Sequence, residues 1–258
     1  MDFTTTAYTE LLKTLQAASY TFYRFVDYME IEKPSEPLVI LRHDVDRRPH
    51  NALETAKIEK SLDIKASYYF RIVKESFHPP IIKEIAAMGH EIGYHYEDIT
   101  LAHGDTEKAM ENFKKNIALF RGLVPIKTLC MHGSPFSKWD NRETWKTHNY
   151  KDYGFIGEPY YDIDFSKVLY LTDTGRRWNG REVSVRDRVV SPFAFDIKTT
   201  AGLIDGIKKG ELPRQIMFNI HPERWDKSLL PWFKQLVLQN TKNVVKRFVA
   251  RKRAQANN

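Results

Sequence analysis

Short apolar segments rich in β-branched and aromatic residues recur along this chain, and the stretches between them carry apolar residues at helical spacing. This alternation is typical of β/α units built around parallel strands, and it limits the possible folds more than any other feature. The clearest helices are expected over 51–61, 80–88 and 106–122. The expected strands occupy 37–45, 66–72, 90–96, 127–132, 155–159, 168–172 and 215–221. The sequence therefore predicts an α/β fold with about seven strands.

The chain shows no internal repeat, no Ser/Gly linker and no change of composition that would divide it into domains. With 258 residues, 42% of them hydrophobic, it can bury a large core without disulfides. We expect one domain over residues 1–241 and a basic C-terminal tail over 242–258.

The net charge of +7 is concentrated in that tail. Residues 242–258 hold six basic residues and no acidic one, whereas residues 1–241 hold 34 basic and 33 acidic residues. A body this close to neutral does not offer an extended phosphate-binding surface, so we expect no nucleic-acid partner. The alternative is a tail that binds nucleic acid or an anionic membrane, and its binding would be lost on deletion of the residues after Thr241.

The cysteine content and the apolar pattern bear on location. A single cysteine, Cys130, excludes an intramolecular disulfide and fits a reducing compartment. The first residues lack the pattern of an export signal, and no uninterrupted run of 18 apolar residues occurs. We therefore expect a cytoplasmic protein without a transmembrane segment.

An acidic pair, Asp44 and Asp46, lies at the end of the first long strand. Because side chains alternate along a strand, both carboxylates point to the same side, about 7 Å apart. Two carboxylates on one face repel each other, which suggests a metal ion or an acid/base pair. The alternative is a pair of loop aspartates neutralised by Arg42, Arg47 and Arg48.

The run GHEIGYHYED ends another expected strand, and His95 and Glu97 share one of its sides. Gly93 leaves room beside them for a substrate or an ion. Imidazole together with carboxylate suits a divalent metal such as zinc, although a single strand histidine is more often a hydrogen-bonded structural residue.

Two further histidines end apolar strands in the same way, His132 in LCMHGSP and His221 in FNIHPE. Each places an ionisable group at the carboxyl edge of the sheet, where α/β proteins build their sites. Four strands that end in Asp/Asp, His, His and His together favour a metal-assisted active site.

The motifs RHDVD, GHEIGYH, MHGSP, YLTDTGRRW and NIHPE, in this order, resemble those of the polysaccharide deacetylase superfamily. These proteins are also described as NodB-homology or carbohydrate esterase family 4 proteins, and the resemblance runs from about Val39 to Glu223. It implies a distorted (β/α) barrel, often of seven strands. It also implies removal of N- or O-acetyl groups from sugars with a divalent metal, usually zinc.

The resemblance assigns roles to individual residues. It implies that Asp44 is the catalytic base, that Asp46 and His95 are metal ligands, and that His221 is the general acid. Val45 separates two aspartates that are adjacent in many members, although some deformylases of lipid-linked sugars in this superfamily share the Asp-x-Asp form.

The resemblance also covers a groove segment. Asp173, Arg176 and Trp178 match the aspartate and tryptophan segment that, in the family, braces the catalytic histidine and walls the substrate groove.

Two positions depart from the family pattern. The second metal histidine, four residues after the first, is replaced by Ile99, which cannot bind a metal. Glu97, Asp98 or His132 could supply the third ligand. The arginine-proline motif that usually orients the base is replaced by MHGSP.

The hypothesis is a metal-dependent hydrolase, most simply a zinc enzyme, that removes an acetyl or similar acyl group from an amino sugar or another carbohydrate precursor. One alternative is a noncatalytic carbohydrate-binding relative that has lost its metal, suggested by Ile99. Another is a hydrolase of a different C–N bond, such as an imide or a formamide.

Overall fold

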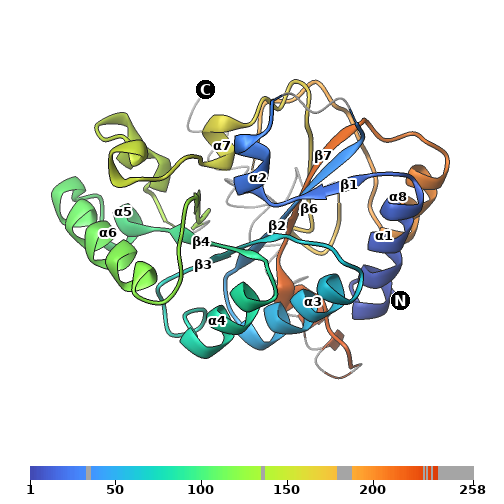
Figure 1. The fold of residues 1–258 in the computed structure, drawn as a ribbon, viewed down its shortest axis with the longest axis horizontal. Helices are drawn as coiled ribbons and strands as arrows, with labels where there is room; N and C mark the ends of the chain where they lie inside the picture. Colours follow the sequence, from blue (N-terminus) through green and yellow to red (C-terminus); the bar gives the residue numbers. More distant parts are fainter. Residues whose placement is uncertain are drawn as a thin grey trace.

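A computed structural model describes residues 1–32, 36–134, 137–178, 188–228, 230, 232–233 and 235–237. In these residues seven strands form one sheet, and every pairing between them is parallel. The sheet curls into a half-barrel, with helices around it (Figure 1). The predicted α/β fold is confirmed as a distorted (β/α) barrel.

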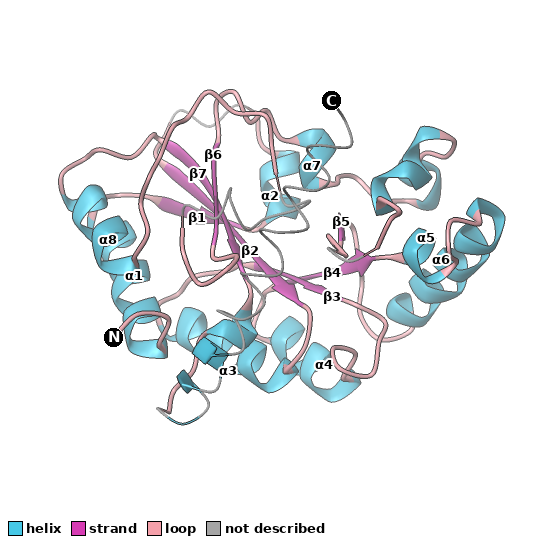
Figure 2. Ribbon diagram, turned by 180° about the vertical axis from the view of Figure 1, so that it is seen from behind, coloured by secondary structure: helices cyan, strands magenta, loops and turns pink. Residues whose placement is uncertain are grey.

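The strand order is β5-β4-β3-β2-β7-β6, and β1 pairs with β2 beside this path. The strands are β1 (Thr21–Tyr23), β2 (Leu38–Val45), β3 (Ser67–Phe70), β4 (Glu91–Tyr96), β5 (Leu129–Met131), β6 (Leu169–Thr172) and β7 (Gln215–Ile220). Seen from behind, they fan out as one continuous twisted surface (Figure 2). All the strands end at the same edge, because they are parallel.

Helices connect the strands, and the longer ones cover the outer side of the sheet. Figure 1 shows α3 and α4 below the central strands, α1 and α8 side by side on the right, and α5 and α6 on the left. The α-helices are α1 (Thr5–Ala17), α2 (Phe25–Glu30), α3 (Pro49–Ser61), α4 (Pro79–Ala87), α5 (Asp98–Leu101), α6 (Thr106–Arg121), α7 (Pro159–Asp162) and α8 (Thr200–Lys208). The 3₁₀ segments are η1 (Asn141–Lys146), η2 (Tyr150–Tyr153) and η4 (Pro222–Arg224).

Six of the seven expected strands are present, and the expected strand over 155–159 is wrong. Only one bridge forms there, between Thr128 and Gly157. Pro159 then occupies the first turn of α7, where its fixed backbone angle and missing N–H are tolerated. The chain therefore turns into a helix before a ladder can form. Strand β1 has only three residues and was not expected from the sequence.

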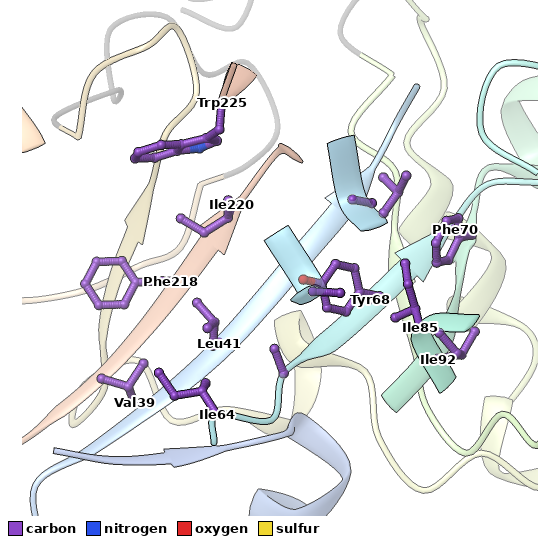
Figure 3. Close-up of a cluster of buried hydrophobic side chains, with 14 of the residues drawn as sticks. Val39, Leu41, Ile64, Tyr68, Phe70, Ile85, Ile92, Phe218, Ile220 and Trp225 are labelled. Atoms are coloured by element: carbon purple, nitrogen blue, oxygen red, sulfur yellow. The ribbon is translucent and has the colours of Figure 1, made fainter. Parts of the chain in front are cut away.

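Alternation along β2 divides its side chains between two environments. Val39, Leu41 and Val45 belong to the large outer core between the sheet and the helices, whereas Leu38 and Ile40 belong to a smaller cluster inside the barrel. Figure 3 shows the outer core, with Val39 and Leu41 beside side chains from β3 and β7. Residues 42 and 44, in register with Leu38 and Ile40, therefore face the barrel interior.

A buried polar network crosses the outer core next to this strand. Glu59 of α3 accepts hydrogen bonds from the hydroxyls of Tyr8 and Tyr68, the latter at 2.8 Å, and lies 2.7 Å from His43 Nε2. The imidazole of His43 stacks on the ring of Tyr68 with centroids 4.2 Å apart. Since Glu59 and His43 have no exposed surface, this network ties α1 and α3 to the strand that carries the acidic pair.

No described helix is both long and apolar enough to cross a membrane. The expected basic tail, 242–258, lies outside the described residues. The cytoplasmic location and the single domain over 1–241 stay predictions.

We predict that Glu59→Ala lowers the free energy of unfolding by about 3–5 kcal/mol, because it leaves buried polar groups without their acceptor. Glu54→Ala on the same helix should cost less than about 1 kcal/mol, since Glu54 is half-exposed and its carboxylate lies 3.9 Å from the ammonium of Lys227. Urea denaturation measures both values. Equal losses in the two variants would contradict a stabilising role of the network.

Candidate functional site

Three side chains from the ends of three strands meet at one carboxylate oxygen, which belongs to one of them. Asp46 follows β2, His95 lies in β4, and His132 follows β5. Asp46 Oδ1 lies 3.5 Å from His95 Nε2 and 3.4 Å from His132 Nε2. One ligand atom of each residue lies within 4.8 Å of the other two. The parallel sheet thus brings together residues that are up to 86 positions apart in the sequence.

Both histidines are oriented through their Nδ1 atoms. His95 Nδ1 lies 2.9 Å from the carbonyl oxygen of Cys130, and His132 Nδ1 lies 2.8 Å from Glu97 Oε2. Because these partners are acceptors, each Nδ1 donates a hydrogen, and the lone pair of each Nε2 faces Asp46. This is how metal-binding histidines are commonly held in place.

The residues fit a divalent cation. Asp46 Oδ1 is buried and has no hydrogen-bond partner among the described residues. Burial alone would raise the pKa of Asp46, but positive charge on the neighbouring imidazoles of His132 and His95 outweighs it and holds the pKa well below its usual range. Two imidazole lone pairs and a carboxylate repel each other unless a cation or a proton lies between them. One carboxylate and two imidazoles are also a donor set that zinc accepts.

The geometry distinguishes the three residues that could supply the third ligand. His132 joins Asp46 and His95, whereas Glu97 lies behind His132 and is bound by Arg71, with Nε 2.7 Å from Oε1. Asp98 turns away into α5, where it accepts a hydrogen bond from Tyr94 at 2.8 Å. Burial raises the pKa of Asp98 to about 7. The geometry therefore favours His132 as the ligand and Glu97 as the group that orients it.

Asp44 faces the same space and is bound by an arginine of its own strand. Arg42 donates to both carboxylate oxygens, with Nε 2.9 Å from Oδ1 and Nη2 2.6 Å from Oδ2. Asp44 Oδ2 also lies 3.8 Å from His95 Nε2, so both aspartates approach the same imidazole nitrogen, as alternation predicts. Burial would raise the pKa of Asp44, but Arg42 and His95 outweigh it and lower this pKa to about 2.

The alternative in which arginines neutralise both aspartates holds for Asp44 alone. Arg42 pairs with Asp44, but Arg48 pairs with Asp226, at 2.5 Å between Nη2 and Oδ1. Asp46 is left facing the two imidazoles. The structure thus separates the pair into one aspartate held by a guanidinium and one available to a cation.

His221 follows β7 and is held by Asp173. Its Nδ1 lies 2.7 Å from Asp173 Oδ1, and its backbone N–H donates to Oδ2 at 3.0 Å. Arg224 and the indole N–H of Trp225 also donate to Asp173. Burial and Arg224 would lower the pKa of His221, but Asp173 and Asp46 raise it more, so it lies above the usual value. His221 is therefore poised to carry a proton on Nε2.

Arg176 and Trp178 lie in a different environment from the metal-ligand cluster. The guanidinium of Arg176 donates to the backbone oxygen of Arg224 at 3.0 Å and lies 5.1 Å from the ring centroid of Phe3. Trp178 is 3% exposed, and its ring packs edge-on against Phe218 in the outer core. Their assignment to a substrate groove stays a prediction. A substrate would reach the ring of Trp178 only if the residues around it moved.

Glu223 and Arg71 were not among the residues expected from the sequence. Glu223 is 4% exposed and its Oε2 has no hydrogen-bond partner among the described residues. Burial and the neighbouring Asp46 raise the pKa of Glu223. Its only sequence signal is its place in the NIHPE run. Arg71 follows the apolar strand β3, and besides Glu97 it binds the backbone oxygen of Asp46 at 3.3 Å.

Neither a family profile nor a curated protein matches the sequence. Among solved structures, the chain is similar to a carbohydrate esterase family 4 pseudoenzyme from Bacillus anthracis. A mutant with restored enzymatic activity aligns at 15% identity over 83% of this chain and 65% of that chain, with a TM-score of 0.45. The wild-type structure aligns at 14% identity over 83% of this chain and 63% of that chain, with a TM-score of 0.44.

A further similar structure is that of Bacillus subtilis PdaA, a family 4 carbohydrate esterase. It aligns at 14% identity over 81% of this chain and 86% of that chain, with a TM-score of 0.39. The chain thus spans slightly less than two thirds of the Bacillus anthracis protein and most of PdaA.

We predict that Asp46→Ala and His132→Ala each abolish tight zinc binding, because each removes one of three ligands. Glu97→Gln should weaken it by about 10–100-fold, as expected for loss of a residue that orients a ligand. Titration against a chromophoric chelator measures the affinities. His103→Ala is the control, since His103 is exposed. Undiminished zinc affinity in the His132→Ala protein would contradict the assignment of the third ligand.

Proposed function

We propose that this chain is a metal-dependent hydrolase that removes an acetyl or similar acyl group from an amino sugar or another carbohydrate. The observation that carries the proposal is the convergence of the His95 and His132 imidazoles on a carboxylate oxygen of Asp46. This oxygen is buried and has no hydrogen-bond partner among the described residues. Asp44 and His221 supply an acid/base pair beside it. The resemblance of the RHDVD, GHEIGYH and NIHPE motifs supports the class of substrate.

Asp46, His95 and His132 would hold the cation, and zinc suits this donor set best. When bound, the cation supplies a Lewis acid that polarises the acyl carbonyl and lowers the pKa of coordinated water toward neutrality. Glu97 keeps the His132 imidazole in the tautomer that binds, and the Cys130 carbonyl does the same for His95. Arg71 holds Glu97 in turn.

Asp44 would accept the proton of the attacking water. It is ionised at neutral pH, and Arg42 fixes both of its oxygens beside His95. Arg42 therefore provides the guanidinium that, by the resemblance, a later arginine motif provides in other family members.

His221 would protonate the departing amine. Asp173 binds Nδ1 and stabilises the imidazolium form, so that Nε2 carries the proton to be donated. Asp44 thus takes one proton from the attacking water, and His221 gives one proton to the amine, so the protons balance.

We predict that His221→Ala retains zinc and loses turnover by about 10²–10⁴-fold, because it removes the general acid and no ligand. Asp44→Asn should lose activity by a similar factor. The assay is acetate release from N-acetylated amino-sugar oligomers and from nucleotide-linked amino sugars, with His103→Ala as the control. Full turnover in a metal-free Asp46→Ala protein would contradict the proposal.

A noncatalytic carbohydrate-binding protein is the second candidate, favoured by Ile99 at the position of a family metal histidine. The zinc titration and the acetate assay separate the two. Zinc binding with no release from any acylated sugar, imide or formamide would favour the noncatalytic protein. Release from an imide or a formamide alone would identify a hydrolase of another C–N bond.

A further inference from the structure

Cys130 lies inside the half-barrel, next to His95 on the neighbouring strand. The two residues are register partners in the parallel pairing of β4 with β5, and both are buried. The side chain of Cys130 belongs to the apolar cluster on the inner side of the sheet. It is the only cysteine of the chain.

Cys130 belongs to a second group of ligand atoms. Its sulfur, a carboxylate oxygen of Asp44 and a nitrogen of His95 lie within 4.8 Å of one another, and all three residues are buried. The side chains of Asp46 and His132 are 17% and 14% exposed, against 2% for Asp44. The group with Cys130 therefore lies deeper in the barrel than the group with Asp46.

The two groups share His95. His95 Nδ1 donates to the carbonyl of Cys130, so only Nε2 can bind a metal. A single lone pair serves one ion at a time. The groups are thus alternative positions for a cation rather than two sites that fill together.

We propose that Asp44, His95 and Cys130 form a second, deeper metal position. It takes divalent ions softer than zinc, such as Cd²⁺, and it cannot be filled together with the position at Asp46 and His132. The proposal rests on the proposed function in that it takes His95 as a metal ligand. Binding would form a metal–sulfur bond and release the thiol proton to solvent.

Charge and ligand type explain the discrimination between ions. The guanidinium of Arg42, bound to Asp44, opposes a cation at the deeper position, and the thiolate offsets that charge. Cd²⁺, which is softer than zinc and binds sulfur more strongly, gains enough to enter. Zinc also accepts imidazole and carboxylate ligands, and Mg²⁺ or Mn²⁺, which prefer oxygen ligands, gain little from the sulfur. Harder ions therefore stay with Asp46 and His132.

A filled deeper position has a functional consequence. It engages Asp44 and the free nitrogen of His95, the base and one ligand of the proposed reaction. An ion softer than zinc, such as Cd²⁺, would therefore inhibit the hydrolase, and removal of the thiol would relieve the inhibition.

The test is ultraviolet absorption of the metal-free full chain titrated with Cd²⁺. Because Cys130 is the only cysteine, a thiolate-to-cadmium charge-transfer band reports this residue alone. We expect the band in the unaltered chain and in His132→Ala, which lacks one ligand of the position at Asp46 and His132. Cys130→Ser should lose the band and still bind one Cd²⁺ by equilibrium dialysis, through Asp46, His95 and His132.

Cys130→Ala is the second variant, and circular dichroism establishes that each variant is folded. Cd²⁺ binding without the band in the unaltered chain, or loss of the band in His132→Ala, would overturn the deeper position and leave the proposed function standing. A band that depends on Cys130 in a protein that hydrolyses no acylated sugar would support the deeper position and contradict the proposed function. Absence of Cd²⁺ binding in the unaltered chain would overturn the deeper position.

Discussion

The site depends on a buried carboxylate oxygen that faces two imidazole lone pairs. Asp46 Oδ1 lies within 3.5 Å of nitrogen atoms from two other strands and accepts no hydrogen bond from the described residues. Such an arrangement is costly without a cation or a proton, because an unpaired buried charge loses its hydration. The two imidazoles are oriented by the backbone carbonyl of Cys130 and by Glu97. The surrounding residues thus hold in place a cluster that a positive charge inside it would stabilise.

Strand β2 carries polar groups on both faces, and those of each face have their own partner. On the inner face Arg42 holds Asp44, and on the outer face His43 binds Glu59 of α3. These contacts fix the strand from both sides next to Asp46, which lies one residue beyond its end. Positional precision at a strand end is what a metal ligand requires, since small displacements change the coordination geometry.

Much of this fold follows from the sequence, because buried parallel strands read as apolar runs and their polar ends stand out. The alternation of side chains along a strand is also enough to place Asp44 and Asp46 on one side. The choice of His132 requires knowing that β5 lies beside β4, which no local pattern encodes. Glu97 and Asp98 are neighbours in sequence but separate because α5 begins at Asp98. The network at Glu59 was not predicted because a glutamate in a helix is ordinarily exposed.

Ile99 is the strongest argument against a metal, and its surroundings weaken that argument. It is 3% exposed and packs with Ala102 and Ala109 in a small apolar cluster between α5 and α6. A histidine there would have to leave that cluster to bind an ion. In the proposed site the imidazole comes instead from His132, at the end of the adjacent strand, so the donor set still has two imidazoles and one carboxylate. Loss of a ligand position in the motif therefore does not imply loss of the donor set.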